Sequence, residues 1–593
     1  MKLNGIVKTG LIVLLLSACR TSDQGAEYVS QVSIIEYNQD YFRELMGEER
    51  YESAFINYYA LYPRGNEGED WALIQDNLRE GVTGEFHKAL EEKNYGRALS
   101  LYNSLERTSN LAQIEIGRGD LNYDYLLYLM EEEYAGAAAC WFMENRESLP
   151  LDGKKRDELE AYFLESRLAT ALEGVVQLKE EAGEGVGSES RDFLHNRAEK
   201  KDMLDGTATI WVNRGIRVEN GVGTPDRVIG SGFFIDPEGY ILTNYHVIYS
   251  EVDPTYEGYS RLYVKLNENE NERIPATVVG WDPVLDLALL KVEITPPYVF
   301  SFSGEDDYTL GESIFAIGSP GGLSNTVTSG TISNMGRELQ AMGDSLQVDV
   351  PINPGNSGGP LLNQKGEAIG VVYAGVEDYE GINFAIPASY VKELLPRLYE
   401  GGKIDYGWMG LVAYKEFGKI INRYIVPGTA AELSSLEGGD EIVGINGIPV
   451  EDIKDIHDIL ISSFPGEIVY LDLIRKGEEI SLPVGVEKRP DYPMKTVLNR
   501  DSIDNLFAPL FGMSTVRINK GKNMRQYRIE EVYPGSVGDE SGLVTGDSFT
   551  LNKWMDMEEE KVLVIQIVIK ARKSGFMTSG LQMGLWYDMN YFL

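Results

Sequence analysis

The sequence has 593 residues, and 93 Asp and Glu residues against 54 Lys and Arg residues give it a formal net charge of −39. This length predicts about three to five domains, and a strongly negative chain without a run of basic residues argues against nucleic acid as the main partner. The two cysteines and four histidines exclude a disulfide scaffold and a thiolate zinc site, and they leave little room for a His-rich metal cluster.

The first residues have the pattern of an export signal. Lys2 and Lys8 form a short positive region, and the apolar stretch that follows at 10–16 is too short to span a bilayer as a stable helix. The Leu-Ser-Ala-Cys sequence that ends at Cys19 resembles the lipobox of bacterial lipoproteins. The resemblance implies a signal peptide at 1–18 and a lipid on Cys19, which would anchor the protein in a bacterial cell envelope, facing the periplasm or the surface. The alternative is an ordinary secretory signal in which Cys19 has no special role.

Residues 19–180 are predicted to form a helical module, because aromatic residues and leucines recur at helical spacing. The segments 51–59, 95–102 and 134–141 each place a small residue three positions after an aromatic residue, which lets a neighbouring helix approach closely. They resemble tetratricopeptide (TPR)-type helical hairpins, and a generic helical bundle is the alternative because their spacing is irregular. Cys140 lies in a small-residue pattern and is predicted to be a buried free thiol.

Glycines and acidic residues from 180 to 190 predict a linker at 181–203. After this linker, short runs of β-branched and aromatic residues alternate with turn residues as far as about residue 400. Many short strands at near-regular spacing are typical of a barrel or a sandwich. The sequence therefore predicts an all-β domain at 204–400.

Three segments of this β-rich region carry the residue types that acyl transfer by a serine needs. His246 follows an apolar strand, Asp286 precedes another, and Ser357 lies in the glycine-rich sequence NPGNSGGP at 353–360. A serine hydroxyl is a poor nucleophile until a base takes its proton, and a histidine held by a carboxylate is such a base. Asp282 is the rival carboxylate, but its position before a proline is typical of a turn residue.

The order His, Asp, Ser and the flanking motifs resemble the trypsin-like proteases of the Deg/HtrA type. The flanking motifs are GSGFFI at 230–235, GSPG at 318–321, SGTIS at 329–333 and NFAIP at 383–387. The resemblance implies a chymotrypsin-like double barrel, with Ser357 as nucleophile, His246 as general base and acid, and Asp286 as its orienting carboxylate. It also implies an oxyanion hole made by the backbone N–H groups of Gly355 and Ser357, with Asn356 as a further candidate.

The region 403–488 resembles a PDZ domain. It contains the sequence GWMGLV, followed by Pro-Gly, Gly-Asp and Ile-Asn-Gly elements. In that family, the loop that corresponds here to Trp408, Met409, Gly410 and Leu411 presents backbone N–H groups to the carboxylate of a peptide. The bound peptide then adds a strand to the edge of a sheet.

Weaker echoes of the same elements predict a divergent second PDZ-like domain at 505–593, with its candidate loop at 510–513. The Ile-Asn-Gly turn is absent from this second copy, so its ability to bind a peptide is in doubt. The predicted fold is therefore multidomain: a helical, TPR-like N-terminal module, an all-β double barrel, and one clear and one divergent PDZ domain of the α+β class.

Together, these resemblances imply an envelope-anchored serine endopeptidase that needs no cofactor and no ATP. Its predicted substrates are unfolded or specific envelope proteins. Its own PDZ domains would recognise the exposed C-termini of such proteins or regulate cleavage. Its predicted assembly is a homo-oligomer of at least three chains. The alternative is a proteolytically silent scaffold or chaperone built from helical hairpins and PDZ domains. The complete set of His246, Asp286 and Ser357 argues against that alternative, because a scaffold needs none of them.

Overall fold

The computed structural model describes residues 39–61, 69–195, 200–219, 221–267, 272–304, 308–322, 326–337, 341–375, 381–519, 525–572 and 576–593. These residues form two compact units, one from the described parts of Met1–Ile114 and Asp405–Leu593, the other from those of Glu115–Ile404. The predicted signal peptide and Cys19 lie outside the described residues. Of the helices in the described ranges, none combines enough length with enough apolar character to cross a lipid bilayer.

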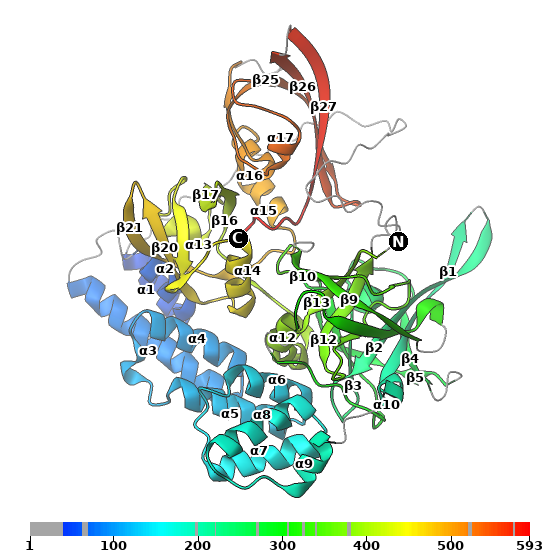
Figure 1. The fold of residues 1–593 in the computed structure, drawn as a ribbon. Coiled ribbons are helices and arrows are strands. Elements are labelled where there is room, and N and C mark those ends of the chain that lie inside the picture. Colours follow the sequence, from blue (N-terminus) through cyan, green and yellow to red (C-terminus); the bar gives the residue numbers. More distant parts are fainter. Residues whose placement is uncertain are drawn as a thin grey trace. The chain divides into compact units, whose positions relative to one another are not determined.

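The N-terminal region is helical, as predicted, and its helices form hairpins with one kind of turn (Figure 1). The turn residues Glu49, Lys93, Glu133 and Arg167 have φ between 55° and 61°. The residue after each of them donates its N–H to the carbonyl oxygen five positions earlier, as in the motif that commonly ends a helix. The hairpins are α1 (Gln39–Gly47) with α2 (Tyr51–Leu61), α3 (Glu69–Glu91) with α4 (Tyr95–Arg107), α5 (Arg118–Glu131) with α6 (Ala135–Asn145), and α7 (Gly153–Glu165) with α8 (Ala169–Glu181).

Small residues are buried where these helices pack. Ala54, Ala98 and Ala137 each follow an aromatic residue by three positions, and none of the three exposes any surface. Cys140 in α6 is also buried, and burial raises the pKa of its thiol to about 12. Cys140 is therefore a packed neutral thiol, as predicted, and not a reactive thiolate.

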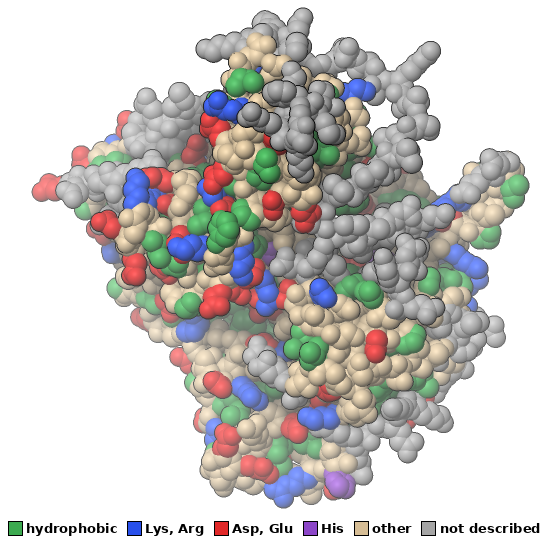
Figure 2. All heavy atoms as spheres, turned by 45° about the horizontal axis from the view of Figure 1, so that its top comes forward, with side chains coloured by type: hydrophobic (Ala, Val, Ile, Leu, Met, Phe, Trp, Pro, Cys, Tyr) green, Lys and Arg blue, Asp and Glu red, His purple; other side chains and the backbone are tan. Residues whose placement is uncertain are grey.

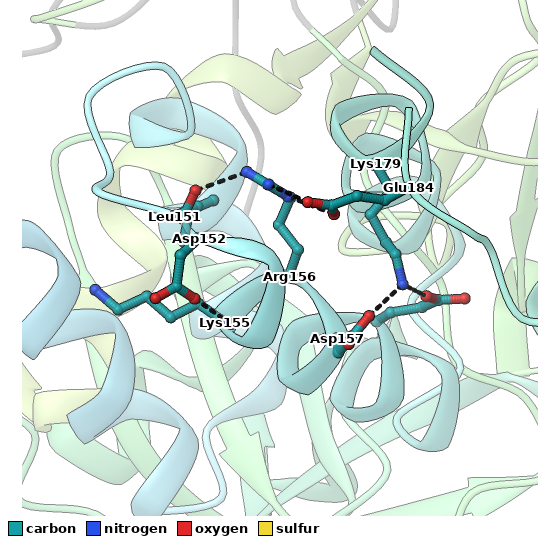
Figure 3. Close-up of polar contacts among 8 residues, drawn as sticks. Leu151, Asp152, Lys155, Arg156, Asp157, Lys179 and Glu184 are labelled. Carbon is teal, nitrogen blue, oxygen red and sulfur yellow. Dashed lines mark hydrogen bonds and ion pairs between the residues drawn. The ribbon is translucent and has the colours of Figure 1, made fainter. Parts of the chain in front are cut away.

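The segment predicted as a linker, 181–203, is not extended along its described length. Arg156 of α7 donates from Nε to Oε2 of Glu184 at 2.9 Å, and Lys179 of α8 donates to Asp157 at 2.5 Å (Figure 3). The first pair and the hydrogen bond from the N–H of Gly187 to Oε1 of Glu160 at 2.9 Å hold the start of the segment on the α7–α8 hairpin, and the second pair joins α8 to α7. Its helices are α9 (Ser188–His195) and α10 (Lys200–Asp205).

The β-rich region contains two sheets. The first consists, in spatial order, of β14 (Gly402–Lys403), β6 (Thr277–Asp282), β7 (Leu287–Lys291), β3 (Tyr240–Thr243), β2 (Val222–Phe234), β1 (Thr207–Glu219), β4 (Arg261–Leu266) and β5 (Ile274–Pro275). The second consists of β10 (Ser345–Val348), β13 (Asn383–Pro387), β12 (Ala368–Gly375), β11 (Pro360–Leu362), β8 (Ser313–Gly318) and β9 (Thr326–Arg337), and it closes into a barrel. Of the two predicted barrels, the structure shows one closed in the residues it describes, because the first sheet ends in β14 and β5.

Each sheet encloses its own apolar core. Phe234, Ile241 and Leu290 are fully buried in the first, and Val348 and Leu361 in the second. Strands β3, β7, β8 and β13 are buried at consecutive positions, so both of their faces are covered, since successive side chains point to opposite faces of a sheet. The helices of this region are α11 (Tyr245–Val252), η4 (Pro320–Gly322) and α12 (Ala388–Glu400).

The region predicted as the first PDZ domain is a β-sheet with helices α13 (Ala430–Leu433) and α14 (Ile453–Ser462). The sheet runs in the order β16 (Leu411–Glu416), β17 (Lys419–Ile425), β18 (Glu441–Ile445), β20 (Ile468–Arg475) and β21 (Glu478–Gly485), with β19 (Ile448–Pro449) paired to β18. A short separate pair joins β15 (Gly407–Trp408) to β22 (Glu487–Lys488).

The second PDZ-like region is a five-stranded meander with short helices before and within it. The strands are β23 (Met513–Arg517), β24 (Arg525–Val532), β25 (Ser548–Met557), β26 (Val562–Arg572) and β27 (Phe576–Trp586). The helices are α15 (Pro493–Arg500), α16 (Phe507–Phe511) and α17 (Val537–Glu540). Strand β25 leads directly into β26, so this region lacks, among its described residues, a counterpart of α14.

Within the same unit, helix α4 is fixed to the sheet of the first PDZ region. Arg107 and Asn103 donate to the two carboxylate oxygens of Glu467 at 2.6 and 2.7 Å, and Glu467 is fully buried. Ser104 accepts a hydrogen bond from the N–H of Ile468 at 3.1 Å. A buried carboxylate is costly without such partners, so these contacts hold the helix on the sheet.

Charged side chains are interspersed over the surface. Figure 2 shows acidic and basic side chains mixed on the face that it draws, without a broad basic patch among the described residues of that view. A mixed, net negative surface is typical of a solvated protein and offers little attraction to a phosphate backbone.

Candidate active site

His246 and Asp286 lie together at one edge of the first sheet, where β3 ends and the neighbouring antiparallel strand β7 begins. His246 lies in the first turn of α11, directly after β3, and Asp286 precedes β7 with a left-handed φ of 59°. Asp286 Oδ1 accepts the N–H of His246 at 2.8 Å, and Asp286 Oδ2 lies 2.6 Å from His246 Nδ1. The backbone oxygen of Asp286 accepts from Asn244 Nδ2 and from the N–H of Tyr245, which stabilises the strained backbone.

The electrostatics of the pair favour a proton on His246. Burial opposes the charged imidazolium, but the negative charge and the hydrogen bond of Asp286 outweigh it and raise the pKa of His246 above its ordinary value of 6.5. The carboxylate at Nδ1 also selects the tautomer that carries its proton there, so that Nε2 is free to accept a proton. The ring is 45% exposed, which leaves it accessible to a substrate.

Ser357 lies between β10 and β11 in the glycine-rich turn. Its Oγ donates to the carbonyl oxygen of Tyr373 at 3.4 Å, and among the described residues no hydrogen bond joins it to His246. A bond of this length is weak. A rotation of the serine side chain is therefore needed before the hydroxyl reaches the imidazole, and such loose geometry is common in unliganded enzymes.

The predicted oxyanion donors differ in availability. The N–H of Asn356 donates to the carbonyl oxygen of Asn353 at 3.0 Å, so it is engaged within the turn. In the part of the chain that the structure describes, the N–H groups of Gly355 and Ser357 have no such acceptor, and Gly355 has a φ of 110° that glycine adopts readily. In this geometry the N–H groups of Gly355 and Ser357 are available to an oxyanion, and the N–H of Asn356, the further candidate, is engaged within the turn.

Ser231 in β2 clamps the turn and was not predicted from the sequence as a site residue. Its hydroxyl donates to the carbonyl oxygen of Gly355 at 2.6 Å and accepts the N–H of Ser319 at 2.9 Å, and its own N–H donates to the carbonyl oxygen of Ser357 at 2.7 Å. A Cβ added to Gly358 would lie 2.1 Å from the carbonyl oxygen of Ser231. The only sequence signal was the small, polar residue in the GSG motif.

Replacing Ser231 by alanine is expected to lower kcat by about ten- to a hundredfold with little change in KM, because it releases the turn that positions the nucleophile. The control is Ser303→Ala, since the Ser303 hydroxyl is also buried but has no hydrogen-bond partner among the described residues. Steady-state kinetics on an unfolded protein substrate would measure both variants. An unchanged kcat in Ser231→Ala would show that the clamp does not position Ser357.

The rival carboxylate, Asp282, has a different role. It is fully buried, and its two oxygens accept the N–H groups of Val284 and Leu285 at 2.9 and 3.2 Å. Those bonds stabilise the turn between β6 and β7. The structure thus places Asp286, and not Asp282, beside His246.

The predicted PDZ loop has the form expected for an anion site. Trp408 and Met409 are buried, Gly410 has a φ of 84°, and a Cβ added there would lie 2.4 Å from Thr429. The N–H groups of Gly410 and Leu411 point to one spot, where both donate to the same oxygen atom of the chain. The four predicted loop residues are therefore arranged around one acceptor.

The loop of the second PDZ-like region has a related frame but lacks one donor. The carbonyl oxygen of Gly512 accepts the N–H of Tyr533 at 2.8 Å, just as that of Gly410 accepts the N–H of Val426 at 2.8 Å. However, the N–H of Gly512 donates to Ala508 at the end of α16. With this donor engaged and without a counterpart of α14, the second region is poorly suited to take a peptide carboxylate.

Comparisons with known proteins agree with this arrangement. The family described as "Trypsin-like peptidase domain" matches residues 230–371, and the family described as "TP0546 family PDZ domain" matches residues 494–586. A protein of Chlamydia pneumoniae named "Probable periplasmic serine endoprotease DegP-like" is 32% identical over 340 residues, 54% of this chain and 67% of the relative. A protein of the same name from Marinomonas sp. is 32% identical over 341 residues, 54% of this chain and 70% of the relative. The solved structure "HtrA-type protease AlgW with tripeptide" is 28% identical, with a TM-score of 0.43, and covers 49% of this chain and 96% of that chain.

Proposed function

Since the chain belongs to the family of DegP-like serine endoproteases, with a trypsin-like peptidase domain and a PDZ domain, we propose that Ser357, His246 and Asp286 are its catalytic triad. The observation that supports this assignment best is the carboxylate of Asp286, which bonds to both the backbone N–H and Nδ1 of His246. That double contact fixes the ring with Nε2 free to act as a base.

The chemistry follows from these positions. Ser357 Oγ attacks the carbonyl carbon of a peptide bond while His246 Nε2 takes its proton, and the N–H groups of Gly355 and Ser357 bind the oxyanion that forms. The intermediate then collapses to an acyl-enzyme, and His246 gives its proton to the departing amine. A water molecule, deprotonated by the same nitrogen, attacks the ester; the bond between the acyl carbon and Ser357 Oγ then breaks, Oγ takes the proton back from Nε2, and the acid product leaves. Asp286 stabilises the imidazolium in both steps.

We further propose how the remaining regions serve this reaction. The relatives are named periplasmic, which supports an envelope location, and a lipid on Cys19 after removal of residues 1–18 would anchor the protein there. The peptidase domain at 204–400 would cleave unfolded or specific envelope proteins without ATP. The PDZ domain at 403–488 would bind the exposed C-termini of such proteins, and the divergent domain at 505–593 would support it.

The helical module at 19–180 is proposed to be TPR-like. The repeated turn at Glu49, Lys93, Glu133 and Arg167 supports this proposal. In a helical repeat array each helical hairpin is one repeat, and here four hairpins have the same connection. Assembly into a homo-oligomer of at least three chains is proposed from the family resemblance.

The proposed role of His246 predicts how activity depends on pH. Only the neutral imidazole accepts the serine proton, and Asp286 raises the pKa of His246 above 6.5, so kcat/KM should fall as the pH is lowered through a midpoint above that value. The measurement is the rate of cleavage of casein between pH 5 and 9 without ATP. A rate that stays constant from pH 8 down to pH 5 would contradict the role of His246, and a complete lack of cleavage would contradict the proposed function.

A further inference from the structure

The last residues of the sequence lie in the groove of the first PDZ domain. Strand β27 ends at Trp586, and the chain then returns to β16, where Figure 1 marks its C-terminal end close to β16 and α14. Tyr591, Phe592 and Leu593 are all buried, and Leu593 exposes no surface. This segment and the domain belong to the same compact unit. Residues 588–593 are called the docked segment below.

The docked segment pairs with β16 as an added antiparallel strand. The N–H groups of Gly410 and Leu411 donate to the backbone oxygen of Leu593 at 2.9 and 3.0 Å, and the N–H of Leu593 donates back to Leu411 at 2.9 Å. Two residues further along, the N–H of Ala413 donates to the carbonyl oxygen of Tyr591 at 3.2 Å, and an antiparallel bridge lies between these contacts. Strand addition of this kind is how a PDZ domain takes up a peptide.

Helix α14 forms the opposite wall of the groove through His457. This side chain is buried, and the backbone of Asn590 forms a hydrogen bond with its ring. Burial, together with the positive charge of Arg489, lowers the pKa of His457 to about 3 in spite of that hydrogen bond. The ring is therefore neutral and packs against the docked segment as an uncharged side chain.

Two side chains of the docked segment make further contacts outside the strand pairing. Asp588 accepts two hydrogen bonds from the guanidinium of Arg489, one of them at 3.2 Å, and Arg489 is only 6% exposed. Tyr591 stacks on Tyr414 of β16 with ring centroids 4.9 Å apart, and its hydroxyl donates to the carbonyl oxygen of Leu510 at 3.1 Å. The docked segment is therefore held by backbone hydrogen bonds, by aromatic stacking and by an ion pair. Such a combination of contacts is typical of a specific interaction.

We propose that residues 588–593 are an internal ligand of the first PDZ domain, and that a partner peptide binds there only by displacing them. This inference rests on the proposed peptide-binding role of Trp408–Leu411 and extends it. The docked segment occupies the groove, so a partner peptide must compete with it and binds with a lower apparent affinity. The partner that fits best is a peptide with an apolar C-terminal residue preceded by aromatic residues, since that is the chemistry the groove holds in Leu593, Phe592 and Tyr591.

The loss of apparent affinity for a partner peptide follows from mass action. The docked segment belongs to the same chain and the same compact unit as the groove, so its binding is intramolecular and it competes strongly with any free peptide. The apparent dissociation constant for a partner equals the intrinsic one divided by the fraction of open grooves. If one groove in about ten or fewer is open, removal of the internal ligand tightens partner binding about tenfold or more.

The test measures binding of a synthetic peptide to the whole chain. The probe is WYDMNYFL, the sequence of residues 586–593, with a fluorophore at its N-terminus and a free carboxylate, and binding is followed by fluorescence anisotropy. All proteins carry Ser357→Ala so that the probe stays intact. Leu593→Lys places an ammonium group in the apolar site and should release the docked segment, so we expect this variant to bind the probe at least about tenfold more tightly than the parent.

The matched control is Phe417→Lys, which makes the same change of charge in the same domain. Phe417 lies in the turn after β16 and is 93% exposed, so its replacement should leave the affinity unchanged. Adding Gly410→Ala to Leu593→Lys should abolish binding, because the new Cβ would collide with Thr429. Hydrogen exchange of the Gly410, Leu411 and Ala413 amides gives an independent readout, and we expect faster exchange at all three in Leu593→Lys alone.

The outcomes separate this inference from the proposed function. Equal probe affinity in the parent and in Leu593→Lys, with equal exchange at the three amides, would overturn the internal ligand while leaving peptide recognition intact. Absence of probe binding to every protein would contradict peptide recognition by this domain. In that case faster exchange in Leu593→Lys would still support the docked segment, and unchanged exchange would overturn it as well.

Discussion

Replacement of Ser357 by alanine is expected to lower kcat by about 10⁶-fold, to a rate that ordinary assays do not detect. The alanine has no oxygen to attack the substrate, and the other members of a triad contribute little without the nucleophile. The measurement is cleavage of an unfolded protein such as casein by the purified chain, compared with the same assay on the variant. Ser357 is only partly buried and its hydroxyl makes one weak hydrogen bond, so the variant should fold and melt like the parent.

The matched control for this prediction is Cys140→Ala. Cys140 is a free cysteine in the described residues, but burial raises the pKa of its thiol to about 12, so its loss should leave kcat unchanged. Cleavage that survives in Ser357→Ala would show that another group performs the reaction. A loss of activity in Cys140→Ala at unchanged stability would likewise contradict the assignment.

Replacement of Asp286 by asparagine is expected to lower kcat by about 10⁴-fold. An amide bears no charge to stabilise the imidazolium, and its NH₂ group facing Nδ1 selects the wrong tautomer of His246. The left-handed φ of 59° at this position is compatible with asparagine, so the backbone should stay in place and the effect should be chemical. The acid limb of the pH profile should also move to lower pH, because the charge and hydrogen bond that raise the pKa of His246 are removed.

Asp282→Asn is the matched control, because it makes the same chemical change four residues earlier. The Asp282 carboxylate accepts hydrogen bonds from two backbone N–H groups in a turn, whereas in the described part of the chain the carboxylate bonded to His246 is that of Asp286. Its replacement should reduce the free energy of unfolding and leave kcat within a few-fold of the parent. A larger loss of kcat in Asp282→Asn than in Asp286→Asn would exchange the roles of the two residues.

The pairing of His246 with Asp286 was predicted from short motifs because residue type and chain order carry that information. A histidine after one strand, an aspartate before another and a serine in a glycine-rich turn are each recognisable locally. The role of Ser231 could not be read in the same way, since a serine in a buried strand looks ordinary until the fold brings it to Gly355. Asn356 was a reasonable oxyanion candidate, and only the backbone bond to Asn353 shows that its N–H is engaged.

The domain pattern shows the same division between local and non-local information. The loop at Trp408–Leu411 and the later glycine motifs predicted a first PDZ domain at 403–488, and the family match at 494–586 confirmed a PDZ domain in the second region. The occupant of the groove was not predicted, because its Tyr-Phe-Leu ending acquires meaning only when the fold returns it to β16. His457 is packed against that ending. The helices in the predicted linker were missed because the segment is held by contacts with residues outside it, such as the Arg156–Glu184 pair before α9 and the hydrogen bond from Thr207 of β1 to the carbonyl oxygen of Met203 in α10.

The most direct test of the central claim is labelling with a fluorophosphonate followed by mass spectrometry of the intact chain and its peptides. Such a reagent reacts with a serine only when a neighbouring base takes the proton and an oxyanion hole binds the phosphonyl oxygen. With His246 as the base and Ser357 as the nucleophile, we expect one adduct per chain on Ser357, formed faster at pH 8 than at pH 5 and absent from Ser357→Ala. An adduct that persists in Ser357→Ala would show that another residue is the nucleophile and would contradict the triad. No adduct on the wild-type chain, even when the peptide WYDMNYFL is added, would contradict the triad as well and favour a silent scaffold.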